Sequence, residues 1–227
     1  MAINKTKDMI FLSVKVEGRN KKGLYTSKWV NKLFSMIERN CTYKNIGFCC
    51  LTDNPKGLRK DIQVIPLKHD SALRGWWAKI KLFNPDLPFE KGQRLIYSDL
   101  DNLIVNNIDE AVRFPAKFAL TSITAPNFKP DGVIICYNSS FMAWNHGEKS
   151  EIYTEFNDSV PKKLRSDQDW MAYILGKNET VMPSSWFQRL GLCSEKGPDQ
   201  TTKVVFCIKP KNHIAAKEIE WVRKIWQ

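Results

Sequence analysis

The length and composition of this chain indicate one folded domain. Its 227 residues are 43% hydrophobic, which allows a large core and argues against wholesale disorder. The formal net charge of +11, from 35 basic and 24 acidic residues, predicts attraction to a polyanion: nucleic acid, anionic lipid or nucleotide phosphates. No apolar stretch is long enough to span a membrane and the first residues do not form a signal peptide, so we expect a cytoplasmic protein.

In the first half of the chain, predicted strands alternate with predicted helices. Runs of apolar and β-branched residues predict the strands, and apolar residues at helical spacing predict the helices. In chain order these are a strand at 9–16, a helix at 27–39, strands at 46–51 and 62–67, a helix at 76–83 and a strand over 95–97. Such alternation predicts an α/β fold, with a mostly parallel central sheet flanked by helices on both faces. Ligands of such sheets bind at the carboxyl ends of the strands.

The second half of the chain is less regular. We expect strands at 117–123, 133–137 and 204–208, and helices at 167–175 and 215–226. No internal repeat or linker is present, so residues 1–227 are predicted to form a single domain. The terminal helix carries basic residues beside Trp221 and Trp226. It either packs its apolar side on the sheet or makes a peripheral contact with an anionic membrane surface, and the sequence leaves both interpretations open.

Two carboxylates follow the apolar strand at 95–97. Asp99 and Asp101 are two residues apart, and in an extended chain such residues point to one side, while Leu100 would turn into the core. Carboxylate oxygens suit Mg²⁺ or Mn²⁺, which proteins share with substrate phosphates. The pair therefore predicts a metal held against a nucleoside diphosphate. Two solvated acids at a strand end are the alternative.

The order and spacing of several segments carry a family resemblance. The segments are 25–40 with 50–53, 75–79, 97–101 and 137–140, with support from 167–169 and 209–211. Together they resemble the GT-A fold glycosyltransferases, and among them the small bacterial and viral enzymes related to glycosyltransferase family 8. The resemblance implies a Rossmann-like domain that transfers a sugar from a nucleoside-diphosphate sugar, with a UDP-sugar favoured, to a glycan, glycolipid or protein-linked acceptor. It also implies Mn²⁺ or Mg²⁺ as the cofactor.

The resemblance assigns roles to individual positions. It places the nucleotide at Val14, Lys15, Val16, Asp53 and Asp99. It places the phosphates and the donor sugar at Lys79, Asn138, Ser139, Lys209 and Lys211. Asp99 and Asp101 match the metal-binding pair of the family, and the catalytic candidates Asp167 and Gln168 match its Asp-Gln pair at the reacting sugar. The alternatives are that Lys79 is a solvated lysine and that Asp167 only caps its helix.

The chain departs from the family at the third metal ligand. Related enzymes often carry His-Gly before the last Lys-Pro, and the aligned residues here are Cys207 and Ile208. A thiolate is a softer ligand than Mn²⁺ prefers. We therefore predict His213 as the substitute ligand, while a more loosely held metal and a shifted alignment stay open.

Two other functions compete with glycosyl transfer. Haloacid dehalogenase-like phosphatases also place Asp-x-Asp after an apolar strand, but they carry Thr or Val at the fifth position, where this chain has Leu103. A nucleic-acid-binding protein would explain the net charge of +11 and the eight tryptophans. No zinc-finger spacing or RNP-like pattern supports it. Trp76 and Trp77 are either core residues or a platform for the acceptor.

Overall fold

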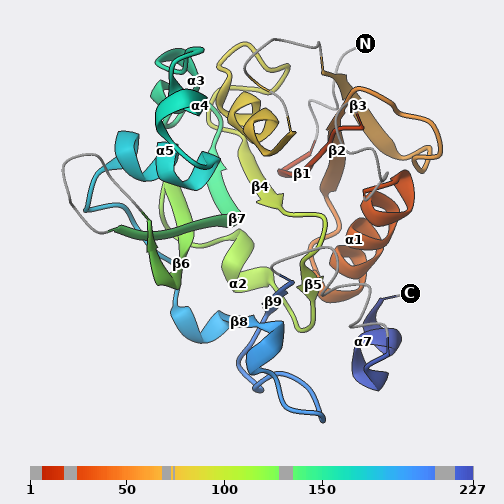
Figure 1. The fold of residues 1–227 in the computed structure, drawn as a ribbon. Coiled ribbons are helices and arrows are strands. Elements are labelled where there is room, and N and C mark those ends of the chain that lie inside the picture. Colours follow the sequence, from red (N-terminus) through yellow and green to blue (C-terminus); the bar gives the residue numbers. More distant parts are fainter. Residues whose placement is uncertain are drawn as a thin grey trace.

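The chain folds around a six-stranded sheet (Figure 1). The computed structural model describes residues 7–17, 25–67, 73, 75–127, 135–207 and 218–226, with the backbone alone at 123–127 and 135–136. The sheet has the order β3-β2-β1-β4-β7-β6, and its strands are β1 Met9–Lys15, β2 Ile46–Thr52, β3 Ile62–Pro66, β4 Arg94–Ser98, β6 Phe118–Asn127 and β7 Ile135–Asn145. A second sheet has the order β5-β9-β8, with β5 Leu103–Ile104, β8 Phe187–Arg189 and β9 Val204–Phe206.

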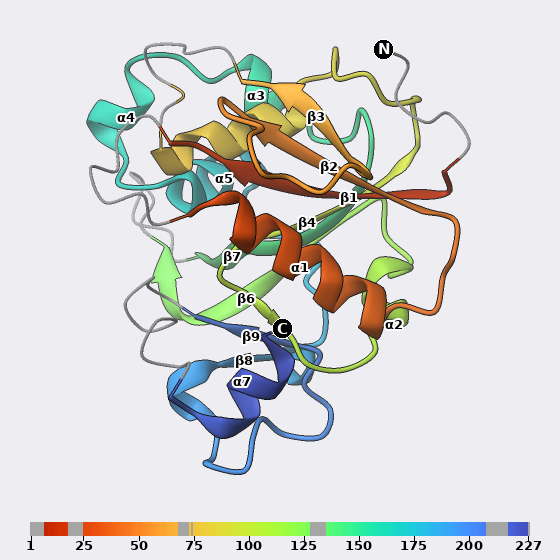
Figure 2. The ribbon, with the colours of Figure 1, turned by 90° about the vertical axis from the view of Figure 1, so that its right-hand side faces the viewer.

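Helices cover both faces of the large sheet (Figures 1 and 2). The described α-helices are α1 Ser27–Asn40, α2 Asp109–Val112, α3 Glu151–Thr154, α4 Val160–Lys163, α5 Asp167–Leu175 and α7 Glu220–Ile225, and the 3₁₀ helices are η1 Gly75–Phe83, η2 Ser184–Trp186 and η3 Leu190–Leu192. Side chains alternate along β1, so Met9 and Phe11 join the core under α1. Ile10 and Leu12 join the core under η1 and α5.

Five of the six strands of the large sheet run in one direction, and β7 runs against them. β3, β2, β1 and β4 pair in parallel, as the strand–helix alternation predicts. β7 pairs antiparallel with both β4 and β6. β6 and β7 follow each other in the chain with a short connection, which suits an antiparallel pair and leaves no room for a helical crossover. The predicted α/β class with a mostly parallel sheet is confirmed, because β7 is the one strand of these six that runs against the others.

Most predicted elements are present, with some shifted ends. The predicted bounds of β1, α1, β2, β3, η1, β4 and α5 each lie within one residue of the observed ones. β7 runs on to Asn145 instead of ending at 137. The polar residues 138–140 interrupt the apolar pattern, but the pairing of β7 with β4 and β6 keeps them within the strand. β9 ends at Phe206, and Ile208 lies outside the described residues. The short elements α2, α3, α4 and β8 were not predicted, since three or four residues show no periodicity.

The end of the chain lies below α1, next to the small sheet (Figure 2). α7 occupies Glu220–Ile225 of the helix predicted at 215–226, and 215–217 lie outside the described residues. Trp221, Val222 and Trp226 are buried in the core that α1 also covers, so the packed interpretation of this helix is the one observed. No helix within the described ranges is long and apolar enough to cross a membrane.

Candidate active site

A buried lysine joins two carboxylates at the centre of the site. Lys79 lies on η1, which Ile80 anchors in the core beside the sheet. Its Nζ lies 2.9 Å from Asp99 Oδ1 and 3.2 Å from Asp167 Oδ2. It also donates a 3.1 Å hydrogen bond to Ser139 Oγ. The alternative of a solvated lysine is wrong, because the side chain is 8% exposed.

Opposing effects set the charge state of Lys79. Burial lowers the pKa of its ammonium group, but the carboxylates of Asp167 and Asp99 outweigh burial, so the pKa lies above the usual lysine value. Lys79 is therefore charged at neutral pH. The carboxylates have further donors: the Tyr97 hydroxyl donates to Asp99 Oδ1 at 2.6 Å. Ser139 Oγ donates to Asp167 Oδ2 at 2.8 Å.

Asp167 opens α5 without capping it. The N-cap is Ser166, whose Oγ accepts the N–H of Asp169 at 3.2 Å. The interpretation of Asp167 as a helix cap is therefore wrong. Asp167 lies in the first turn, where the positive end of the helix dipole favours a carboxylate. Its side chain is free to serve the network of Lys79 and Ser139.

The acidic pair lies in a turn, not in the strand. β4 ends at Ser98, and the N–H of Asn102 donates to the Asp99 carbonyl at 3.2 Å. The turn is tied to β7, because the Asp99 N–H and Asn102 Nδ2 both donate to the Ser140 carbonyl at 2.8 Å. Leu100 packs in the core, as predicted. The expected extended segment is thus corrected to a turn that brings both carboxylates to one pocket.

Asp101 is held by Tyr25 and resists ionisation. The Tyr25 hydroxyl donates to Asp101 Oδ2 at 2.9 Å. Burial, together with the negative charge of Asp99, raises the pKa of Asp101 to about 7. A cation beside the pair would relieve both effects, because it offsets the repulsion and replaces lost hydration.

The pair fits a hard divalent cation. Asp99 Oδ1 belongs to the network of Lys79, and Asp101 Oδ2 accepts from Tyr25. Within the described ranges no side chain donates to the second oxygen of either carboxylate. Two carboxylate oxygens, completed by phosphate oxygens and water, are a usual set for Mg²⁺ or Mn²⁺. The described residues hold no cluster of three His, Cys, Asp or Glu, and the predicted third ligand His213 lies outside them.

Cys207, at the position where the resemblance predicts a histidine ligand, lies near Asp101. Burial, and then the charge of Asp101, raise the pKa of the Cys207 thiol. The thiol is therefore protonated at neutral pH, and a neutral thiol is a poor ligand for Mn²⁺. In this state Cys207 forms part of the pocket wall and supplies no third hard ligand.

The acidic pair opens onto a pocket of about 210 Å³. It is lined by Asp99, Asp101, Asn102, Asn138, Ser140, Gln168, Arg189, Phe206 and Cys207. The predicted residues Asn138 and Gln168 thus meet the acidic pair, and Ser139 contacts Lys79 from the neighbouring network. Arg189 was not predicted, because it lies on a three-residue strand that has no periodicity or motif. The predicted Lys209 and Lys211 lie outside the described residues.

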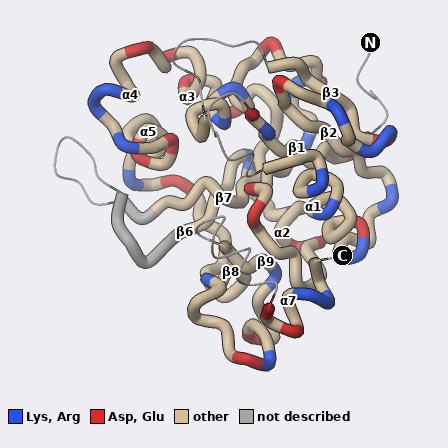
Figure 3. Tube along the Cα trace, turned by 45° about the vertical axis from the view of Figure 1, so that its right-hand side comes forward, with Lys and Arg blue, Asp and Glu red and all other residues tan. Residues whose placement is uncertain are grey.

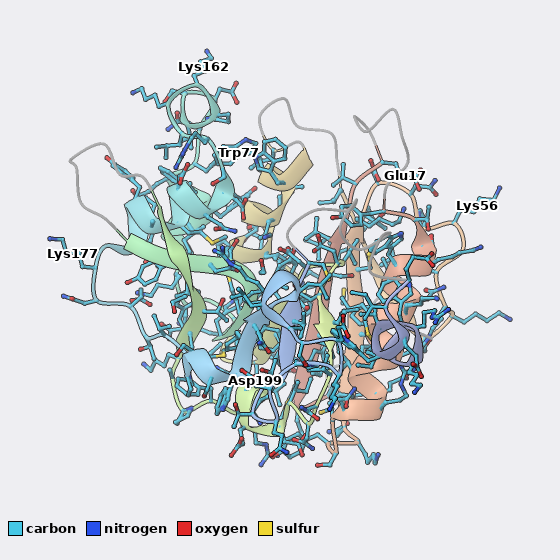
Figure 4. All side chains as sticks on the ribbon, turned by 60° about the horizontal axis from the view of Figure 1, so that its bottom comes forward. Glu17, Lys56, Trp77, Lys162, Lys177 and Asp199 are labelled. Carbon is cyan, nitrogen blue, oxygen red and sulfur yellow. The ribbon has the colours of Figure 1, made fainter. Side chains whose placement is uncertain are left out.

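A second polar group lies where β1 and β2 end. Lys15 is fully buried, and its Nζ lies 2.8 Å from Glu17 Oε1. The Asp53 carboxylate accepts the Glu17 N–H, with donor–acceptor distances of 3.0 and 3.1 Å. Glu17, labelled in Figure 4, thus joins the two predicted nucleotide residues Lys15 and Asp53. Neither these residues nor Val14 and Val16 line the 210 Å³ pocket, as far as the described residues define it.

The two adjacent tryptophans of η1 have different surroundings. The Trp77 ring centroid lies 5.5 Å from that of Phe156, and the side chain is a core residue (Figure 4). Trp76 is 63% exposed. The core interpretation is therefore confirmed for Trp77 and wrong for Trp76, whose role as an acceptor platform stays a prediction.

Comparison with known proteins identifies the fold. No protein-family model matches the sequence, and no curated protein matches it. The galactosyltransferase LgtC, solved in complex with donor and acceptor sugar analogues, matches with a TM-score of 0.57 at 12% identity, over 96% of each chain. The bifunctional glycosyltransferase WbbM matches with a TM-score of 0.58 at 11% identity, over 100% of this chain and 52% of its own.

A third solved structure, the glycosyltransferase GlyE of Streptococcus pneumoniae TIGR4, has a TM-score of 0.54 at 12% identity. It covers 80% of this chain and 46% of its own length. The chain has the fold of these glycosyltransferases, and the GT-A fold expected from the sequence motifs is confirmed.

Proposed function

We propose that the chain is a metal-dependent glycosyltransferase that moves a sugar from a nucleoside-diphosphate sugar to a glycan, glycolipid or protein-linked acceptor. A UDP-sugar is the favoured donor, and Mn²⁺ or Mg²⁺ is the cofactor. The observation that carries this proposal is the pair Asp99 and Asp101, whose second oxygens have no side-chain donor within the described ranges. The likeness to solved glycosyltransferases supports it.

The charges of the site suit a donor that contains a diphosphate. The carboxylates of Asp99 and Asp167 outnumber the one buried lysine, Lys79, and Asp101 adds negative charge when it ionises, so the network carries an excess of negative charge. A bound divalent cation would supply the positive charge that holds the diphosphate and stabilises it as it leaves. The diphosphate itself calls for a further cation, and Arg189 is the basic residue among the described pocket residues. A guanidinium binds phosphate oxygens in a bidentate manner, so we add Arg189 to the predicted phosphate ligands Lys209 and Lys211.

Asp167 and Gln168 serve the reacting sugar in this proposal. Positive charge builds on the anomeric carbon as the bond to the diphosphate breaks, and a fixed carboxylate or amide stabilises that charge. Lys79 and Ser139 fix Asp167, and Gln168 lines the pocket. LgtC has an active-site glutamine, known from the structure of its Gln-to-Glu variant, and this supports the assignment of Gln168.

The remaining predicted residues divide between sugar and nucleotide. The predicted residue Asn138 lines the pocket beside the acidic pair, together with Ser140, which was not predicted, and both suit contacts to the hydroxyl groups of the donor sugar. The group of Lys15, Glu17 and Asp53 marks the carboxyl ends of β1 and β2, where nucleotides bind in sheets of this kind. We assign the nucleobase to that group.

Donor hydrolysis with a panel of nucleotide sugars, with and without Mn²⁺, tests the proposal. Asp101→Ala removes one hard oxygen from the pocket, so metal-dependent turnover should fall by about a hundredfold or more. The matched control is Asp86→Ala, which removes an exposed carboxylate from another loop and should leave turnover unchanged. Near-wild-type turnover in Asp101→Ala, with the fold intact by circular dichroism, would refute the proposed metal site.

The competing functions make different predictions. In the part of the chain that the structure describes, Lys and Arg are spread over many elements (Figure 3) and do not gather into one surface of the kind that binds nucleic acid. A thermal-shift screen separates the two cases, because a transferase responds to a nucleoside diphosphate with Mn²⁺ and a nucleic-acid-binding protein responds to oligonucleotides. The burial of Trp221, Val222 and Trp226 gives no support to a peripheral membrane contact through the apolar side of α7.

A further inference from the structure

One carboxylate of the acidic pair is held by a residue from a distant part of the chain. Tyr25 precedes α1, and its hydroxyl donates to Asp101 Oδ2 at 2.9 Å across 76 positions of sequence. A phenol is protonated at neutral pH and is a good donor to a carboxylate. The hydrogen bond fixes the rotation of the carboxylate and leaves Oδ1 for the pocket. Without it, repulsion from Asp99 would favour a rotation that separates the two charges.

The ring of Tyr25 rests on a row of aromatic side chains. It meets Trp29 edge-on, with ring centroids 5.2 Å apart and an interplanar angle of 82°. Trp29 in turn meets Trp226, with centroids 5.1 Å apart at 62°. Trp29 and Trp226 are buried, so their positions are set by packing. The row therefore connects the acidic pair to the residue that follows α7.

Basic residues of α1 fasten the end of α7. Arg39 Nη2 donates to the Ile225 carbonyl at 2.7 Å. Lys32 Nζ donates to the Trp226 carbonyl at 3.1 Å and lies 5.3 Å from the centroid of the Trp226 ring. Cations at the C-terminal end of a helix satisfy carbonyls that the helix leaves unpaired. These contacts hold Trp226 against Trp29, and Figure 2 shows α7 below α1.

We propose that Tyr25 is the positioning residue of Asp101, and that the C-terminal segment keeps Tyr25 in place through Trp226 and Trp29. The proposal rests on the proposed function, since it gives α7 a part in presenting a metal ligand. Partners of metal ligands set the direction of the ligand atom, and their loss typically weakens metal binding by about 10- to 100-fold. α7 thus acts on the pocket without lining it.

Mn²⁺ affinity, measured by electron paramagnetic resonance in the presence of UDP, tests the role of the hydroxyl. Tyr25→Phe keeps the ring on Trp29 and removes the donor to Asp101, so Mn²⁺ binding should weaken by about tenfold while the metal-free unfolding midpoint changes little. The matched control is Tyr43→Phe, because the Tyr43 ring packs against the core and Arg113, away from the pocket. Mn²⁺ affinity of Tyr25→Phe within twofold of the wild type overturns the positioning role.

A double-mutant cycle tests the connection to α7. Trp226→Leu should weaken Mn²⁺ binding on its own, and should add little in the Tyr25→Phe background, because both act through the same hydrogen bond. Fully additive effects, or no effect of Trp226→Leu, would overturn the connection. Trp226→Phe keeps an aromatic ring on Trp29 and should retain most of the affinity, which keeps the test valid if Trp226→Leu folds poorly. A wild type that binds no Mn²⁺ with UDP would instead overturn the proposed function itself.

Discussion

Two groups of residues adjoin the acidic pair and are built differently. On one side lie Lys79, Asp99, Ser139 and Asp167, which we call the network side. These polar groups bind one another and are largely buried, and of the four Asp99 lines the pocket. On the other lie Arg189, Phe206 and Cys207 of β8 and β9 and the residue after β9, which we call the β8–β9 side. There the only described charge is one guanidinium.

The network side is preorganised before a ligand binds, whereas the β8–β9 side is suited to recognise the ligand. On the network side each charge is fixed by another, so the geometry exists before a ligand arrives, and a missing member leaves its partners buried without compensation. On the β8–β9 side the ring of Phe206 stacks on Phe187, with centroids 5.6 Å apart, and this apolar support holds the strand independently of Arg189. A change at Arg189 should therefore affect the ligand more than the fold.

The largest effect is expected when the network side loses its lysine. Lys79→Met leaves the buried carboxylate of Asp167 and the partly buried carboxylate of Asp99 without their cation, which should lower the free energy of unfolding by about 3–5 kcal/mol and abolish donor turnover. Urea denaturation measures the first effect. Lys177→Met is the control, because Lys177 projects from the surface (Figure 4) and should change neither quantity. A loss below about 1 kcal/mol, the scale of a surface ion pair, would show that the network is not the preorganised side.

A smaller and different effect is expected on the β8–β9 side. Arg189→Gln should weaken UDP binding in the presence of Mn²⁺ by about tenfold, the scale of one charge-assisted hydrogen bond, with an unchanged unfolding midpoint. The UDP affinity of Arg189→Lys should lie between that of the wild type and that of Arg189→Gln, since an ammonium keeps the charge and loses the bidentate geometry. Isothermal titration calorimetry measures both, with the exposed Arg223→Gln as control. If Arg189→Gln unfolds more easily and binds UDP normally, the roles of the two sides are reversed.

The smallest effect concerns pH. Because the pKa of Asp101 is raised to about 7, Mn²⁺ competes with a proton below that value, so the apparent Mn²⁺ affinity should rise with pH and level off above about 7. The folded-state pKa lies above the unfolded value of about 4, so this group favours the metal-free fold at low pH, and that contribution is lost as pH rises from about 4 to about 7. Mn²⁺ titrations at several pH values test this. An Asp101→Asn variant with the same pH profile would assign the profile to another group.

The sequence by itself determined the strands β1 to β4, the helices α1 and α5 and much of the network side. Runs of apolar and β-branched residues marked the strands and apolar residues at helical spacing marked the helices, so their bounds were predicted to within one residue. Lys79, Asp99, Ser139 and Asp167 lie in segments whose order resembles that of a known family, so these positions were found before their contacts. The extent of the domain over 1–227 stays a prediction.

Only the tertiary structure decided which residues meet. Lys79 and Ser139 are 60 positions apart, and Tyr25 and Asp101 are 76 apart. Arg189 enters the pocket on a strand too short to show any period. A local pattern reports which side of its own helix or strand a residue occupies, and it carries no information on the element that lies opposite. That element depends on the order of the strands in the sheet and on the packing of α7, to which the whole chain contributes.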